Sequence, residues 1–156
     1  TRKQGLLQGI TEEQLRTQGK IDLNIKTQAY TEWSYAGGLK AMEDILVAHP
    51  DINVVITESD VCVLGAIKAI AQAGKTDDIL IIAGADGQKE AIKYIMDTDF
   101  YGCTAMNSPV QIGENAVEYA IQYLNGKRDF KKTSYTAPLL ITKENAAKYY
   151  NAKAIF

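Results

Sequence analysis

The sequence is poor in the residues on which metal sites and disulfide frameworks depend. Its 156 residues include one histidine, two cysteines and three prolines. Cys62 and Cys103 lie far apart and show no metal-ligand spacing, so we expect two small buried hydrophobic side chains rather than a disulfide. No apolar run approaches the roughly 20 residues that span a bilayer. We therefore expect no metal, no cofactor and no membrane-spanning helix.

An excess of charge of one sign is missing too. The chain has 17 basic and 19 acidic residues, which are interspersed and give a formal net charge of -2. Nucleic-acid-binding domains carry a basic patch or stripe, and this sequence has none that exceeds a local cluster. That cluster, which we expect to be a solvated loop, consists of Lys127, Arg128, Lys131 and Lys132. We expect no nucleic-acid partner.

The common signatures of enzyme active sites are also absent. His49 is the single histidine and precedes Pro50, where we expect a helix to end and the imidazole to face the helix dipole. There is no serine nucleophile elbow and no paired set of metal ligands. Residues 84–87 read GADG, which is not the phosphate-binding GxGxxG pattern. The sequence therefore indicates a protein that is not an enzyme.

Short apolar runs alternate regularly with amphipathic stretches of helical length. The runs predict strands at residues 22–28, 52–56, 79–82, 101–106 and 139–141. The stretches predict helices after residues 37–38, from Ser59 or Asp60 to Gly74, through residues 92–95, from Pro109 to residues 125–126, and over 143–150. This order predicts an α/β fold, a doubly wound and mostly parallel sheet with helices on both faces.

Polar and aromatic side chains follow the predicted strands. Arg2 begins a helix at the start of the chain, and the residues that come after successive strands are Trp33, Ser59, Asp86 and Asn107. Ligands of open parallel sheets bind outside the carboxyl ends of the strands. An indole offers a face to the C–H groups of a sugar, while guanidinium, carboxylate, amide and hydroxyl groups pair with its hydroxyls. The set therefore suits a neutral polyhydroxylated ligand.

Each of these residues also has a structural interpretation, which the sequence leaves open. Trp33 could anchor a loop, and Asp86 and Asn107 could be turn residues. Ser59 could be only a helix cap, and Asp60 fits a cap better than a ligand contact. Arg2 could be solvated, although a cation is unfavourable in the first turn of a helix, which favours a ligand or a carboxylate partner.

Five segments, taken in order, resemble the second half of periplasmic sugar-binding proteins of the ribose and glucose/galactose type. They are RKQGL (2–6), ESDVCVLGAIKAIAQAG (58–74), ILIIAGADG (79–87), TAMNSPVQIGENAVEYA (104–120) and PLLITKEN (138–145). The resemblance implies two similar α/β lobes of the type I class, joined by a three-stranded hinge, with the sugar buried between them.

The resemblance also implies a division of the chain. Residues 1–106 would form the C-terminal lobe without its first strand, residues 107–138 a hinge crossing and part of the N-terminal lobe, and residues 139–156 a return segment with a terminal helix. The N-terminal half, roughly as long again, would be missing.

The implied function is capture of a monosaccharide or related polyol for the permease of an ABC importer or for a membrane sensor. The implied location is extracytoplasmic, either in the periplasm or lipid-anchored on the outer face of the cell membrane. The alternative is the effector-binding core of a LacI-type transcription regulator, which would require a helix-turn-helix upstream of Thr1.

Carried over by position, the resemblance gives each candidate residue a role. Arg2 resembles the arginine that binds sugar hydroxyls, Trp33 the stacking aromatic, Asp86 the carboxylate of the Asp-Gly turn, and Asn107 the amide at the hinge. Ser59 stands where relatives usually have an asparagine, and Ala85 replaces a bulkier residue. Both departures predict a roomier pocket, while Trp33 with Asn107 favours a hexose-like ligand.

Overall fold

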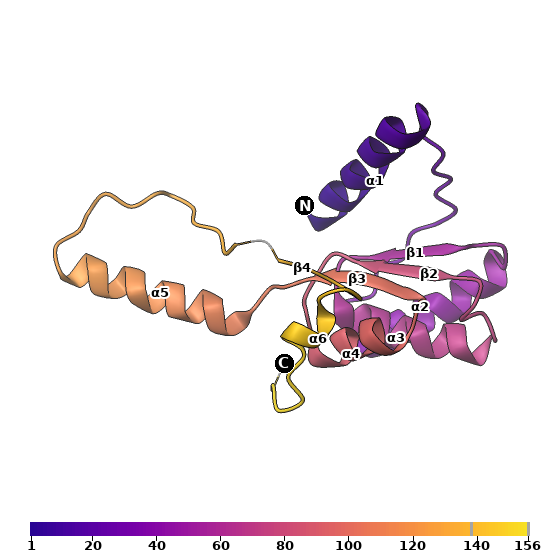
Figure 1. Ribbon diagram of the computed structural model, residues 1–156. Helices are drawn as coiled ribbons and strands as arrows, with labels where there is room; N and C mark the ends of the chain where they lie inside the picture. The colour runs from indigo at the N-terminus through magenta and orange to yellow at the C-terminus, as the bar shows by residue number, and fades with distance from the viewer. Residues whose placement is uncertain (138, 156) are drawn as a thin grey trace.

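The computed structural model of the chain, which describes residues 1–137 and 139–155, has a four-stranded sheet with helices on both sides (Figure 1). The strands β1 (Val54–Thr57), β2 (Leu80–Ala83), β3 (Tyr101–Ala105) and β4 (Leu140–Thr142) are neighbours in that order. β1, β2 and β3 are parallel, and β4 is antiparallel to β3. The prediction of an α/β fold with a mostly parallel sheet is confirmed.

The helices divide unequally between the two sides of the sheet. Their bounds are α1 (Arg2–Gln18), α2 (Tyr35–Ala48), α3 (Asp60–Gln72), α4 (Lys89–Asp97), α5 (Pro109–Leu124) and α6 (Ala146–Tyr149). α2, α3 and α4 cover one side, whereas α1 stands on the other side and has no buried residue (Figure 1). The inner face of α3 carries Val63, Ile67 and Ile70, which are buried together with Ile81 of β2.

The strand predicted at residues 22–28 is wrong, because these residues form neither helix nor strand. Leu23 is half-buried and Ile25 is 60% exposed, so the alternating side chains have no sheet face against which to pack. An alternating sequence can give a strand two different faces, but it does not supply the adjacent strand that its backbone N–H and C=O groups must bond to. Strands need such neighbours to persist in water.

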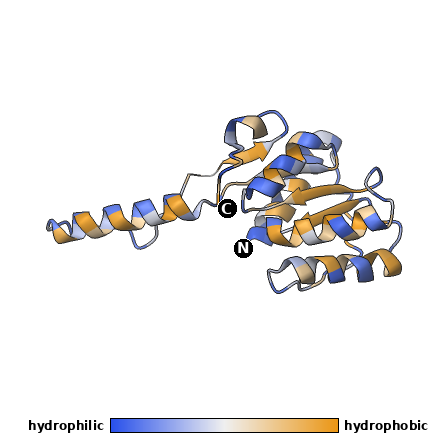
Figure 2. Cartoon of the chain, turned by 90° about the horizontal axis from the view of Figure 1, so that it is seen from below, coloured by the Kyte–Doolittle hydropathy of each residue, from blue (hydrophilic) through white to orange (hydrophobic). Residues whose placement is uncertain are grey.

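α5 leaves the body of the molecule as an arm and the chain then returns to β4 (Figures 1 and 2). None of its residues is buried, and large apolar side chains along it are exposed, with Ile112 at 47% and Leu124 at 81%. Pro138, at the end of the predicted hinge segment, and Phe156, at the end of the return segment, lie outside the described residues. Across the described helices, none has both the length and the apolar composition needed to cross a membrane.

Two glycines allow α2 and α3 to pack with their backbones in close contact. A Cβ atom on Gly38 would lie 2.2 Å from the carbonyl oxygen of Cys62. A Cβ atom on Gly65 would lie 2.0 Å from the carbonyl oxygen of Tyr35, at the start of α2. Both distances are far below van der Waals contact, and the obstructing atoms belong to backbone that cannot rotate away. The helix pair therefore tolerates only glycine at these positions.

We expect Gly65→Ala to lower the free energy of unfolding by about 1–3 kcal/mol, the usual cost of overpacking a core. The matched control is Gly9→Ala in α1, where no atom lies within 4 Å of the added methyl group. That change should leave stability unchanged or raise it by up to about 1 kcal/mol, because alanine favours helices over glycine. Urea denaturation of both variants checks this, and equal effects would contradict the close-packing argument.

Candidate functional site

The predicted binding residues gather at the edge of the sheet where the parallel strands end. The side chains of Arg2 and Ser59 both contact that of Asp86, although the three residues come from α1, from the β1–α3 connection and from the turn after β2. Trp33 lies beside Arg2, and Asn107 contacts Asp86 through its backbone. The structure thus brings all five predicted residues to one place. Ser59, Asp86 and Asn107 meet there because they follow neighbouring parallel strands, whereas Arg2 comes from α1 and Trp33 from a loop that follows no strand.

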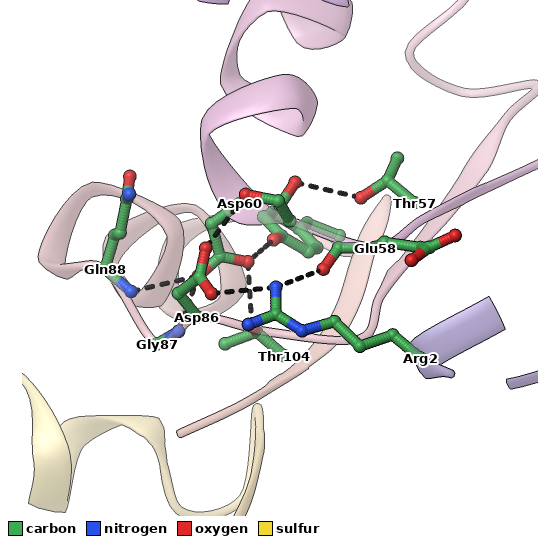
Figure 3. Close-up of polar contacts among 10 residues, drawn as sticks. Arg2, Thr57, Glu58, Asp60, Asp86, Gly87, Gln88 and Thr104 are labelled. Atoms are coloured by element: carbon green, nitrogen blue, oxygen red, sulfur yellow. Dashed lines mark hydrogen bonds and ion pairs between the residues drawn. The ribbon is translucent and has the colours of Figure 1, made fainter. Parts of the chain in front are cut away.

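The carboxylate of Asp86 is the centre of this cluster (Figure 3). Its Oδ2 accepts a hydrogen bond from Ser59 Oγ at 2.8 Å, and its Oδ1 lies 3.0 Å from Arg2 Nη1. The side chain is 14% exposed, so solvent reaches only its tip. A carboxylate has roughly four acceptor positions. These two contacts therefore leave acceptor positions for a ligand.

Arg2 reaches the cluster from the first turn of α1. Thr1 caps that helix with a capping box, so Arg2 is its first residue. Besides the ion pair with Asp86, Arg2 Nη1 donates to the carbonyl oxygen of Glu58 at 2.8 Å. These two negative partners offset the unfavourable position of a cation in the first turn of a helix. The predicted carboxylate partner of Arg2 is Asp86.

Ser59 stands at the N-cap position of α3 but makes no side-chain capping hydrogen bond. Its hydroxyl donates to Asp86 instead, and the residue is 2% exposed. The interpretation of Ser59 as only a helix cap is therefore wrong. A buried hydroxyl that donates to the carboxylate orients Asp86 rather than the helix end.

Trp33 sits in a strained loop before α2. Trp33 and its neighbour Glu32 both have left-handed backbone conformations, with φ of 53° and 51°. The loop is tied down because Ser34 Oγ donates to the carbonyl of Thr31 and accepts from the N–H of Gly37. The indole is 52% exposed, and the Arg2 guanidinium carbon lies 5.3 Å from its ring centroid. Such strain is typical of residues held for a function.

Asn107 follows β3 and lies next to the turn that carries Asp86. Its backbone N–H donates to the carbonyl oxygen of Asp86 at 2.9 Å, and Asp86 and Met106 form an isolated parallel bridge. The segment after β3 therefore continues the sheet up to the turn that carries Asp86. Ser108 then caps α5, and Pro109 occupies its first turn as predicted.

Asp60 has a larger part in this site than the sequence suggested. It is fully buried, yet it is not a side-chain cap of its own helix. Its Oδ2 accepts from the backbone N–H groups of Gly87 and Gln88, and its Oδ1 from the hydroxyls of Tyr101 and Thr104. Its partners Tyr101 and Thr104 are three residues apart in β3, a spacing that would put them on opposite faces of a regular strand, so strand periodicity gives no signal of this contact.

Burial sets the protonation of the groups around Asp60. Burial, and then the nearby charge of Asp60, raise the pKa of the Tyr101 hydroxyl far above its usual value. The same two causes raise the pKa of the Cys103 thiol. Both groups therefore stay protonated at neutral pH, and Tyr101 remains a hydrogen-bond donor. Cys62 and Cys103 are free thiols in the structure.

The cluster offers an aromatic face, a carboxylate with open acceptor positions and a guanidinium within one small area. Charge-assisted hydrogen bonds to such groups are about twice as strong as neutral ones. Across residues 1–137 and 139–155, no three His, Cys, Asp or Glu side chains form a group that could hold a metal ion. The chemistry available is recognition of hydroxyl groups and of an apolar ring face.

Comparison with known proteins identifies relatives among periplasmic binding proteins. The profile of the family described as periplasmic binding protein domain matches residues 1–128. The ribose import binding protein RbsB of Bacillus subtilis is 39% identical over 117 residues, which is 75% of this chain and 36% of that protein. The D-apiose import binding protein of Actinobacillus succinogenes is 31% identical over 132 residues, covering 81% of this chain and 41% of that protein.

Solved structures give the same result. A periplasmic solute-binding protein of an ABC transporter from Actinobacillus succinogenes, with bound D-allose, superposes with a TM-score of 0.77 at 26% identity. That match covers 84% of this chain and 46% of the other, so the chain spans less than half the length of the relatives to which it is similar. On the family profile and these relatives, the chain belongs to the periplasmic binding proteins of the ribose/galactose type.

Proposed function

We propose that the protein containing this chain captures a monosaccharide or related polyol for an ABC importer. One observation carries the proposal: the Asp86 carboxylate is held by Arg2 and Ser59 with acceptor positions left open, next to the half-exposed indole of Trp33. The hydroxyl groups of a sugar would bind Asp86 and Arg2, and its C–H face would stack on Trp33. Such a ligand uses every feature of the cluster. Asn107 borders the same space at the end of β3.

The relatives support this class of ligand. They are binding proteins for ribose and D-apiose and a solute-binding protein with bound D-allose, and a similar solute-binding protein from Bacillus halodurans holds myo-inositol. All four ligands are compact molecules covered with hydroxyl groups. The same relatives are binding proteins of transporters and not enzymes. They favour import over the transcription-regulator alternative.

The proposal extends to the organisation of the whole protein. Residues 1–106 would form most of one lobe, residues 107–138 would cross to the other lobe through α5, and residues 139–156 would return. The exposed apolar side of α5 supports this division, because an exposed apolar helix face normally packs against another part of the protein. The protein would work outside the cytoplasm with a membrane permease or sensor.

We expect the full-length protein to bind at least one of D-ribose, D-apiose, D-allose and myo-inositol at a single site with micromolar or tighter affinity. Isothermal titration calorimetry measures this, and a thermal-shift screen of the same compounds gives an independent readout. Neither heat nor a shift in melting temperature with any of the four would contradict the proposed function.

A further inference from the structure

Asp60 is a fully buried carboxylate whose two oxygens face two different parts of the fold. Oδ2 accepts from the Gly87 N–H at 2.7 Å and from the Gln88 N–H at 2.9 Å, in the turn that directly follows Asp86. Oδ1 accepts from Tyr101 Oη at 2.6 Å and from Thr104 Oγ1 at 2.7 Å, both on β3. One side chain therefore ties the turn after β2 to the neighbouring strand (Figure 3).

Besides Asp60, backbone contacts of Asp86 with Met106 and Asn107 hold this turn. Gly87 has a φ of 80°, so its left-handed backbone favours glycine and gives the turn no side chain with which to pack. Gln88 is the N-cap of α4 but makes no side-chain capping hydrogen bond. The N–H groups at the start of a helix are left without intrahelical partners and must be satisfied from outside. Asp60 satisfies the N–H of Gln88, the N-cap of α4, and also the N–H of Gly87, which precedes the helix.

We propose that Asp60 is a positioning residue for the sugar site, an inference that rests on the proposed function. It does not touch the ligand, since it is 0% exposed. By holding Gly87 and Gln88, it fixes the backbone that carries Asp86 before any ligand arrives. Asp86 then meets Ser59 and Arg2 with its remaining acceptor positions already aimed at the solvent side of the cluster.

The chemistry of the two oxygens predicts a specific pattern of variants. The backbone N–H groups on the Oδ2 side can only donate, whereas the two hydroxyls on the Oδ1 side can donate or accept. An asparagine at this position can therefore keep its oxygen toward the turn and direct its NH₂ group at Tyr101 and Thr104. Asp60→Asn should preserve the turn, and Asp60→Ala should release it.

The experiment measures sugar affinity by calorimetry on the full-length protein, with the tightest-binding member of the panel of D-ribose, D-apiose, D-allose and myo-inositol as the probe. We expect Asp60→Asn to bind within about threefold of the unmodified protein and Asp60→Ala to bind at least tenfold more weakly. The matched control, Tyr101→Phe, removes one hydrogen bond from the same carboxylate on the side of β3. It should lower the melting temperature but leave affinity within about threefold.

Two results would overturn the positioning role: a folded Asp60→Ala protein with unchanged affinity, or a loss in Asp60→Asn or Tyr101→Phe as large as in Asp60→Ala. If the alanine variant does not fold, hydrogen exchange in the sugar-free, unmodified protein decides. The peptide carrying the Gly87 and Gln88 amides should exchange as slowly as β2, and exchange at the rate of an open loop would overturn the proposal. This readout needs no ligand, so it separates a failure of the positioning role from a failure of the sugar-binding proposal.

Discussion

Asp86→Ala is expected to weaken sugar binding by about 2–5 kcal/mol, the range for truncating one member of a largely buried charge pair. The change removes the acceptor that we propose binds a sugar hydroxyl. It also leaves the Arg2 guanidinium without its carboxylate partner at 3.0 Å and the buried Ser59 hydroxyl without its acceptor at 2.8 Å. Calorimetry on the full-length protein should therefore show a fall in affinity of roughly thirtyfold to several thousandfold.

Asp86→Asn should give an intermediate loss. The amide oxygen can still face Arg2 while the amide NH₂ donates to Ser59, whose hydroxyl can reverse, but the charge that strengthens hydrogen bonds to the ligand is gone. The control is Asp97→Ala on α4, which breaks an exposed ion pair with Lys93 of 2.7 Å. Exposed helix pairs contribute only about 0.3–0.5 kcal/mol to stability and nothing to a distant site. Equal affinity losses in Asp86→Ala and Asp97→Ala would show that Asp86 has no direct contact with the sugar.

The gathering of Ser59, Asp86 and Asn107 in the candidate site could be predicted from sequence because it depends on a simple property of parallel sheets. Once β1, β2 and β3 are recognised as parallel strands, the residues that follow them must meet at one edge. Ser59, Asp86 and Asn107 were found in this way without any knowledge of their contacts. Which atoms pair could not be predicted, because it depends on side-chain directions that strand order does not specify.

Residues 22–28 and Asp60 show the two ways in which pattern alone failed. The alternating residues 22–28 have the side chains of a strand, but strand formation depends on a neighbouring backbone that local sequence does not describe. Asp60 was interpreted from its place at the start of a helix, although its partners lie 27 to 44 residues further along the chain. Long-range hydrogen bonds of this kind leave no periodic signal in the sequence.

Trp33→Ala is expected to weaken sugar binding by about 2 kcal/mol or more, the usual cost of removing an aromatic anchor from a closed pocket. The indole is 52% exposed in this chain, so its removal opens little of the core. The cation–π contact with Arg2, 5.3 Å from the ring centroid, is lost as well. The measured affinity should therefore fall about thirtyfold, while the free energy of unfolding changes little.

The strained backbone at Trp33 separates a loss of stacking from a loss of folding. Trp33→Ala keeps the left-handed φ of 53° with a residue that still bears a Cβ atom, whereas Trp33→Gly relieves that strain. The glycine variant should thus be more stable than the alanine variant by about 1 kcal/mol and yet bind sugar as poorly. Trp33→Phe should recover most of the affinity, and Tyr30→Ala, at an 81% exposed residue of the same loop, should leave it unchanged. If affinity followed stability across these variants, Trp33 would be a loop anchor; if it followed the aromatic ring, Trp33 would be the surface on which the sugar stacks.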